Sequence, residues 1–165
     1  MIPVISFISS RSGMGKTTYL EKLIGEMKSR GHRIGVIKHD SHGFEMDVPG
    51  KDTWRHSQAG AEVVCISSPK KFALIKKTQQ DTPLEKIIPL ITDVDYIFVE
   101  GFKKHGVLRV EIFRSSAGFD PLNRPGDLFA VITDADIYPD LPHFSLDLPE
   151  KFADHLEERL GVNRL

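Results

Sequence analysis

The sequence predicts an α/β fold with a mostly parallel, doubly wound sheet and one inserted antiparallel hairpin, and three observations support this prediction. Apolar stretches rich in β-forming residues alternate with helical patterns along the chain, as parallel sheets require. The first of these strands leads directly into a glycine-rich loop at Ser10–Thr17 and then into a helix. A later pair of strands is joined by only a few residues, which is too short for a parallel crossover.

The loop after the first strand resembles a phosphate-binding P-loop. Val4–Ile8 form the strand, and Ser10–Thr17 read S-R-S-G-M-G-K-T. In this pattern the glycines let backbone N–H groups face a phosphate chain, and the dipole of the following helix favours the same anion. We expect Lys16 to reach the β- and γ-phosphates, Thr17 to bind Mg²⁺ and Thr18 to contact the α-phosphate. The expected nucleotide-binding residues of this loop are Ser12, Gly13, Met14, Gly15, Lys16, Thr17 and Thr18.

Ser10 departs from the pattern, because a glycine normally stands at this position. A chance Gly-rich turn is the alternative interpretation, but the motif, the preceding strand and the following helix all coincide. A length of 165 residues suits one domain with a real core. We therefore predict a P-loop NTPase-like fold, with a single P-loop nucleotide-binding domain over residues 1–165.

The first half of the chain continues the alternation of strand and helix. Residues 16–29 carry apolar side chains at helical spacing, and Gly31 is placed to end the helix. The elements predicted next are a strand at Ile34–Lys38, a polar loop over 39–50, a short helix over 51–59, two hairpin strands over 62–66 and 72–76, and a helix over 82–91. Pro89 is expected to kink or shorten the last of these helices.

The second half begins with Tyr96–Glu100, which is almost entirely apolar, as a buried parallel strand should be. Val107–Phe113 and Leu128–Ile132 are further predicted strands, separated by a loop rich in proline and glycine over 115–126. The chain is expected to close with a short strand over 143–146 and a helix over 149–160.

Composition narrows the class of protein. The net charge of −1 argues against a general nucleic-acid or membrane surface. The only cysteine, Cys65, lies within an apolar run, so we expect a buried strand residue, and no disulfide can form within the chain. The sequence has neither a signal-peptide pattern nor an apolar stretch of membrane-spanning length, and we therefore expect a cytoplasmic protein.

Polar residues at the carboxyl ends of the predicted strands are candidates for a site, because ligands of such sheets bind there. Glu100 ends an apolar strand and is placed to hold Mg²⁺ directly or through water. Asp40 is a second candidate for the metal, and a turn or helix cap is its alternative role. His39 and His42, with His56 and His105 elsewhere, leave a transition-metal site as another interpretation.

Thr133 and Asp134 follow a predicted strand where many nucleotide-binding α/β folds recognise the base. A carboxylate there can accept hydrogen bonds from the N1–H and the exocyclic amine of guanine, a donor pair that the same edge of adenine lacks. Asp134 therefore points to guanine, although Asp136 is close enough to read the base instead. An Asx turn after the strand is the alternative without a ligand.

The chain resembles the molybdopterin-guanine dinucleotide biosynthesis protein B (MobB) family. The matching segments run in family order: S-G-M-G-K-T-T at 12–18, K-H-D-S-H at 38–42, D-V-P-G-K-D-T-W-R-H-S-Q-A-G-A at 47–61, V-E-G-F-K at 99–103 and T-D at 133–134. Ser41 departs from the family pattern, which often has histidine there. The P-loop is shared by a vast superfamily, whereas the third and fourth segments together are much more selective.

The resemblance implies a GTP-binding adapter or accessory protein with weak intrinsic GTPase activity, and the P-loop pattern adds Mg²⁺ as the expected metal. Such a protein acts in molybdenum cofactor maturation beside the guanylyltransferase that joins GMP to molybdopterin. Lys16 and Arg11 are the candidate catalytic residues, because charge that develops at the γ-phosphate must be neutralised; an exposed loop arginine is the alternative for Arg11. A P-loop small-molecule kinase and a GTP-dependent metallochaperone remain alternative functions.

The resemblance also implies a homodimer, since the family is similar to dimeric P-loop GTPases with nucleotide sites near the subunit interface. The hairpin from Glu62 to Lys76 carries more apolar surface than an isolated hairpin should, which favours it as part of the interface. The paired lysines at 70–71 and 76–77 leave a monomer as the alternative, because charged residues block pairing at a sheet edge.

Overall fold

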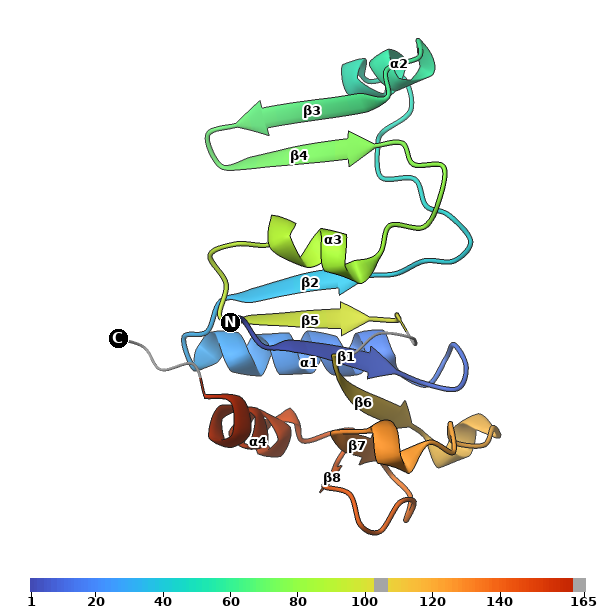
Figure 1. Cartoon of the computed structure of the whole chain (residues 1–165), viewed down its shortest axis with the longest axis vertical. Coiled ribbons are helices and arrows are strands. Elements are labelled where there is room, and N and C mark those ends of the chain that lie inside the picture. Colours follow the sequence, from blue (N-terminus) through green and yellow to red (C-terminus); the bar gives the residue numbers. More distant parts are fainter. Residues whose placement is uncertain (103–106, 162–165) are drawn as a thin grey trace. The chain divides into compact units, whose positions relative to one another are not determined.

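The computed structural model describes residues 1–102 and 107–161, and Figure 1 labels their helices and strands. Contacts divide the chain into two compact units, which are described separately. The first unit, named the sheet unit, comprises Met1–His39 and Leu84–Leu165. The second, named the hairpin unit, comprises Asp40–Pro83. A single nucleotide-binding domain over residues 1–165 stays a prediction.

The sheet unit contains a six-stranded sheet in the order β2-β5-β1-β6-β7-β8, and every neighbouring pair is parallel. The strands are β1 (Val4–Ile8), β2 (Ile34–Lys38), β5 (Tyr96–Glu100), β6 (Leu108–Phe113), β7 (Ala130–Thr133) and β8 (His143–Phe144). Central β1 lies between β5 and β6, so the segments that follow these three strands meet at one edge of the sheet. The predicted α/β class with a mostly parallel sheet is confirmed.

One face of this sheet packs against α1 (Lys16–Ser29) and α4 (Pro149–Leu160). Alternate strand residues point to this face, among them Phe7, which is fully buried. Its ring meets the ring of Phe152 from α4 edge to face, with centroids 6.1 Å apart. Replacing a buried phenylalanine of this kind by alanine costs about 3–5 kcal/mol. No helix in residues 1–102 and 107–161 is long and apolar enough to cross a membrane.

The other face is covered over β2 and β5 by α3 (Leu84–Ile87) and by the 3₁₀ turn η1 (Ile88–Leu90). Leu84 packs there against a second apolar cluster that includes Ile37 and Val99. Pro89 lies inside the 3₁₀ turn, so the α-helix stops at Ile87, as expected of a residue that interrupts helical hydrogen bonding. With elements on both faces, the sheet is doubly wound.

The loop between β6 and β7 contains two 3₁₀ turns, η2 (Ser115–Ala117) and η3 (Pro125–Asp127). Because η3 occupies the end of the loop, β7 starts at Ala130, two positions after the predicted Leu128. Glu111 of β6 is fully buried, and its carboxylate accepts hydrogen bonds from the Leu122 N–H at 2.8 Å and the Tyr138 hydroxyl at 3.1 Å. One carboxylate therefore ties this loop to the loop that follows β7.

The hairpin unit consists of α2 (Asp52–Gln58) and the antiparallel pair β3 (Val63–Ser68) and β4 (Lys71–Lys76). The predicted inserted hairpin is confirmed, with strands slightly longer than expected. The prediction of a buried Cys65 is wrong, because Cys65 lies in β3 but is exposed. Large apolar side chains of the same strands are also exposed: Val63, Ile66, Phe72, Leu74 and Ile75. A two-stranded sheet has two faces and too little chain around it to cover both.

Candidate nucleotide-binding site

The P-loop turns sharply from β1 into α1. Gly13 and Gly15 have φ angles of 83° and 88°, a backbone conformation that residues with a Cβ rarely adopt. Gly15 is the N-cap of α1 and supplies no side-chain hydrogen bond to the helix. The first N–H groups of the helix are therefore available to an anion, which the helix dipole also attracts. Met14 is fully buried and anchors the loop to the core.

Lys16 lies across the base of this loop. Its Nζ donates a hydrogen bond to Ser9 Oγ at 2.6 Å, and Ser9 Oγ donates to the Arg11 carbonyl oxygen at 2.6 Å. Ser9 is almost completely buried at the end of β1. These contacts hold the ammonium group at the loop, where it can serve phosphate oxygens. Sequence reasoning did not identify Ser9; its signal was a polar residue directly after a buried strand.

Thr17 and Glu100 come together although 83 positions separate them. The Thr17 hydroxyl donates a hydrogen bond to Glu100 Oε1 at 2.8 Å, and Lys38 Nζ donates to the same oxygen at 3.0 Å. The side chain of Glu100 is 12% exposed, and that of Lys38 is 56% exposed. A hydroxyl and a carboxylate are the oxygen ligands that Mg²⁺ prefers. This pair at the mouth of the P-loop therefore fits a nucleotide-bound Mg²⁺.

Lys38 was identified as part of a family segment but not as a partner of Glu100. The pairing arises because β2 and β5 are parallel neighbours, with Lys38 in register with Glu100. Gly101 then turns the chain at the end of β5 with a φ of 103°, where a Cβ would lie 3.1 Å from that of His39. This position accepts only glycine, and the turn sets the direction in which Glu100 leaves the strand.

Two of the predicted site residues have other local partners. Asp40 belongs to the hairpin unit, where its Oδ1 accepts a hydrogen bond from the His42 backbone N–H at 2.8 Å. This is the turn arrangement that its sequence setting also allowed. Arg11 is exposed, and its guanidinium lies over the ring of Phe119, 5.7 Å from the centroid. His105, from the alternative metal site, and Lys103, from the V-E-G-F-K segment, lie outside the described residues.

At the end of β7, Thr133 and Asp134 lie beyond the same edge of the sheet. Asp134 is exposed, and one carboxylate oxygen accepts a hydrogen bond from the Ser115 backbone N–H at 2.7 Å. This bond lowers the pKa of Asp134 below its usual value, and the charge of Arg114 adds to the effect. The Thr133 hydroxyl accepts the Ala135 N–H at 3.0 Å. Asp134 is therefore ionised, fixed in orientation and open to a ligand.

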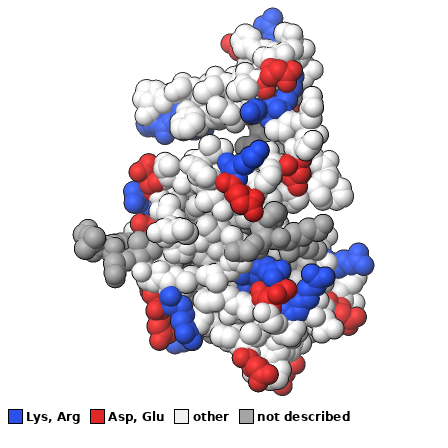
Figure 2. All heavy atoms as spheres, viewed as in Figure 1, with Lys and Arg blue, Asp and Glu red and all other residues white. Residues whose placement is uncertain are grey.

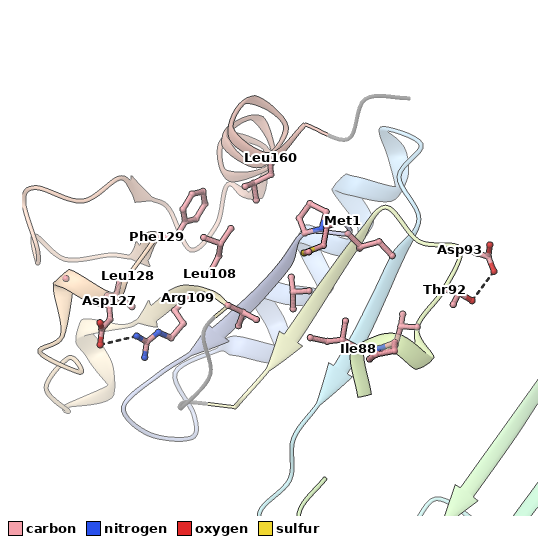
Figure 3. A pocket seen from close by; sticks show the side chains of 17 residues that line it. Met1, Ile88, Thr92, Asp93, Leu108, Arg109, Asp127, Leu128, Phe129 and Leu160 are labelled. Atoms are coloured by element: carbon pink, nitrogen blue, oxygen red, sulfur yellow. Dashed lines mark hydrogen bonds and ion pairs between the residues drawn. The ribbon is translucent and has the colours of Figure 1, made fainter. Parts of the chain in front are cut away.

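A cavity of about 1190 Å³ lies at the other end of the sheet (Figure 3). Its lining includes Val4 and Leu108, which begin β1 and β6, and Phe129, which precedes β7. Arg109 and Asp127 form an ion pair of 3.0 Å on its wall. Ligands of open α/β sheets bind at the carboxyl ends of the strands. This cavity at the amino ends is therefore separate from the candidate nucleotide site.

Charged side chains of both signs lie among one another on the face of the molecule shown in Figure 2. Arg30 illustrates this mixing elsewhere in the sheet unit, since it forms ion pairs with Glu26, Asp154 and Glu157. A nucleic-acid backbone is instead bound by clustered lysine and arginine residues. Among the described residues of the surface shown in Figure 2, lysine and arginine do not form such a cluster.

Comparison with protein-family models matches residues 4–134 to MobB, molybdopterin guanine dinucleotide synthesis protein B. The chain belongs to the MobB family. The match begins with β1 and ends at Asp134, so it includes the P-loop, Glu100 and the end of β7. The resemblance found from the sequence motifs is confirmed.

Individual members of the MobB family resemble the chain over most of its length. The molybdopterin-guanine dinucleotide biosynthesis adapter protein of Escherichia coli K12 is 35% identical over 164 residues, covering 96% of this chain and 93% of the relative. The adapter protein of the same name from Haemophilus influenzae is 36% identical, covering 68% of this chain and 64% of the relative. The crystal structure of Bacillus subtilis MobB superposes with a TM-score of 0.72 at 26% identity, covering 95% of this chain and 98% of that one.

Proposed function

We propose that this protein is a GTP-binding adapter of molybdopterin guanine dinucleotide biosynthesis, with Mg²⁺ as the metal that accompanies the nucleotide. One observation carries the nucleotide part of the proposal. The P-loop, the Thr17–Glu100 pair and Asp134 all lie beyond the carboxyl ends of β1, β5 and β7 in one parallel sheet. The pathway part is supported by the relatives, whose names describe adapter proteins of this biosynthesis.

Each part of the site has a role in binding GTP. The backbone N–H groups after Gly13 and the Lys16 ammonium hold the phosphates, because the N–H groups open the helix and Ser9 keeps the ammonium at the loop. Thr17 and Glu100 provide the oxygen atoms for Mg²⁺, which offsets phosphate charge when it is bound. Asp134 recognises guanine, since an ionised carboxylate accepts both hydrogen bonds from the N1–H and the exocyclic amine.

We expect at most slow, Mg²⁺-dependent hydrolysis of GTP by the isolated protein. Phosphoryl transfer is accelerated when a cation meets the charge that develops at the γ-phosphate. The Arg11 guanidinium is the loop cation proposed for this role, and it lies over Phe119 with its own side chain exposed. Lys16 is therefore the main side chain proposed to contact the phosphates. Its role favours tight binding of GTP more than fast hydrolysis.

An adapter acts through its partners, and the hairpin unit is the surface we propose for a second copy of the chain. The Phe72 and Leu74 side chains of β4 are 74% and 58% exposed, and Ile66 of β3 is 57% exposed. Exposed apolar side chains concentrated on one small unit are typical of an interface. We further propose a cytoplasmic protein that acts beside the guanylyltransferase that joins GMP to molybdopterin.

The nucleotide proposal is tested by calorimetric titration with GTP and with ATP in the presence of Mg²⁺. We expect GTP to bind in preference to ATP, and Lys16→Ala to weaken GTP binding by about 10- to 100-fold, the worth of a charge-assisted hydrogen bond. Lys22→Ala is the matched control, because Lys22 lies on the same helix and pairs with Asp147 at 3.0 Å. Unchanged GTP affinity in a folded Lys16→Ala variant would contradict the proposal. Phosphate transfer from GTP or ATP to a small acceptor would favour a kinase instead.

A further inference from the structure

Arg114 occupies a position in the candidate site that no sequence motif indicated. It follows β6, the strand between β1 and β7 in the sheet. The register pairs Phe113 with Thr133, so Arg114 leaves the sheet at the same level as Asp134. The P-loop begins at the end of β1, on the other side of β6. The topology therefore places Arg114 between the phosphate-binding loop and the residue proposed to read the base.

The side chain of Arg114 reaches the P-loop itself. A Cβ added to Gly15 would lie 3.5 Å from its Nη2 and 3.8 Å from its Nε. The guanidinium therefore lies against the P-loop backbone directly before Lys16. Its positive charge also acts on the carboxylate of Asp134, whose pKa is lowered mainly by the Ser115 backbone hydrogen bond and to a smaller extent by Arg114. The Arg114 side chain therefore contacts the P-loop at one end of the site and acts electrostatically on Asp134 at the other end.

The two lysines of the site already have polar partners. Lys38 is paired with Glu100 at 3.0 Å, and the Lys16 ammonium is bound to Ser9. The Arg114 guanidinium forms no ion pair or hydrogen bond within residues 1–102 and 107–161 that would occupy its donors. The side chain is only partly exposed. A planar group with five N–H donors, held in place but not engaged, is suited to bind a ligand.

We propose that Arg114 is a nucleotide-binding residue that contacts the part of a guanine nucleotide between the β-phosphate and the base. This inference rests on the proposed GTP-binding function and adds a residue to it. The sheet order supports the assignment, because Glu100 marks the metal end over β5, Asp134 marks the base end over β7, and Arg114 at the end of β6 lies between them. Arg114 thereby differs from Arg11, which was considered for the γ-phosphate.

The position predicts a particular dependence on the nucleotide. A residue that contacts the α-phosphate or the nucleoside contributes equally to GTP, GDP and GMP, because all three share that part. A residue that contacts the γ-phosphate contributes to GTP alone. We therefore expect Arg114→Ala to weaken binding of GTPγS, GDP and GMP by a similar factor of about ten, the lower range for a hydrogen bond to a charged group.

The experiment is calorimetric titration of each nucleotide into the wild type, Arg114→Ala and Arg114→Lys, with Arg124→Ala as the matched control. Arg124 is an exposed arginine of the same loop. Arg114→Lys keeps the charge and most of the packing but lacks the planar fork, so it is expected to recover part of the affinity. It also provides the comparison if the alanine variant does not fold, because a loss of affinity is then read from the lysine variant.

The outcomes separate this inference from the proposed function. A similar loss for all three nucleotides in the Arg114 variants, with Arg124→Ala at the wild-type level, supports the inference. Wild-type affinity in the Arg114 variants, while Lys16→Ala loses GTP binding, overturns it and leaves the proposed function standing. A loss confined to GTPγS overturns it as well, because the contact would then be to the γ-phosphate. A wild type that binds no guanine nucleotide overturns both.

Discussion

Glu100→Gln is expected to remove most of the Mg²⁺ dependence of nucleotide binding while the protein stays folded. Glutamine has the same shape and keeps an oxygen that accepts the Thr17 hydroxyl, which now lies 2.8 Å from Glu100 Oε1. The charge that faces Lys38 is lost, but Lys38 is more than half exposed. Glu100 itself is buried, but solvent around the exposed Lys38 screens the pair, which contributes on the order of 1 kcal/mol to the free energy of unfolding. The change in stability should therefore be small.

The effect on binding should be larger and should depend on the metal. Loss of a carboxylate that holds a metal, or its water, lowers metal-linked affinity by about 10- to 100-fold. Without Mg²⁺ the same substitution removes a negative charge from the vicinity of the phosphates, so affinity should stay the same or rise slightly. Titration of GDP in Mg²⁺ and in EDTA measures both quantities on one protein sample.

Lys38→Ala is the companion variant, since it removes the other partner of Glu100 and leaves the carboxylate in place. We expect it to retain the difference between Mg²⁺ and EDTA. An equal loss of affinity in both conditions for Glu100→Gln would refute the reasoning, because Glu100 would then act on the nucleotide or on the fold and not on the metal.

Three further predictions concern the base, the interface and pH. Asp134→Asn should reduce the preference for GTP over ATP, because an amide offers a donor where the carboxylate accepted two bonds; Asp136→Asn is the control in competition titrations, and selectivity that follows Asp136 would reassign the reader. Phe72→Asp should shift a homodimer towards monomer, because it places a charge on an apolar surface; light scattering over a dilution series tests this, and a wild type that is monomeric at high concentration excludes the dimer. Burial raises the pKa of Glu111, so the Glu111 carboxyl group binds its proton more tightly in the folded state than in the unfolded state. The free energy of unfolding should therefore fall as pH rises from the ordinary pKa of about 4.5 to the raised value. Denaturant melts should show less of this decline in Glu111→Gln, and parallel pH profiles for the two proteins would contradict the assignment.

The elements best predicted from the sequence are strands that are apolar along their whole length and are buried in the centre of the sheet. Tyr96–Glu100 is apolar along its length and is buried on both faces as β5. Cys65 lies in a similar apolar run, yet its strand is exposed, because burial there depends on whether anything packs on the hairpin. Local sequence reports the apolar character of a strand but not the presence of a second layer.

The backbone geometry of the candidate site was predictable where one motif determines it, as in Gly13–Thr17. Contacts between distant segments could not be inferred, since they require the strand order. Lys38 reaches Glu100 only because β2 and β5 are neighbours, and Ser115 reaches Asp134 only because β6 and β7 are. Asp134 illustrates both cases: its position after a strand was visible in the sequence, while the backbone donor that orients it was not.

The loop between β6 and β7 is fastened at two points, by the Ser115 N–H bound to Asp134 and by the Leu122 N–H bound to the buried Glu111. A segment held in this way is ordered before any ligand arrives. Ordering a loop on binding would cost free energy for each side chain that is immobilised, about 0.5–1.5 kcal/mol apiece. Here that entropy is lost during folding, so binding of the proposed nucleotide would not carry this cost. The end of the sheet at which we propose base recognition is therefore preorganised, and association should be limited by diffusion and orientation more than by rearrangement of the loop.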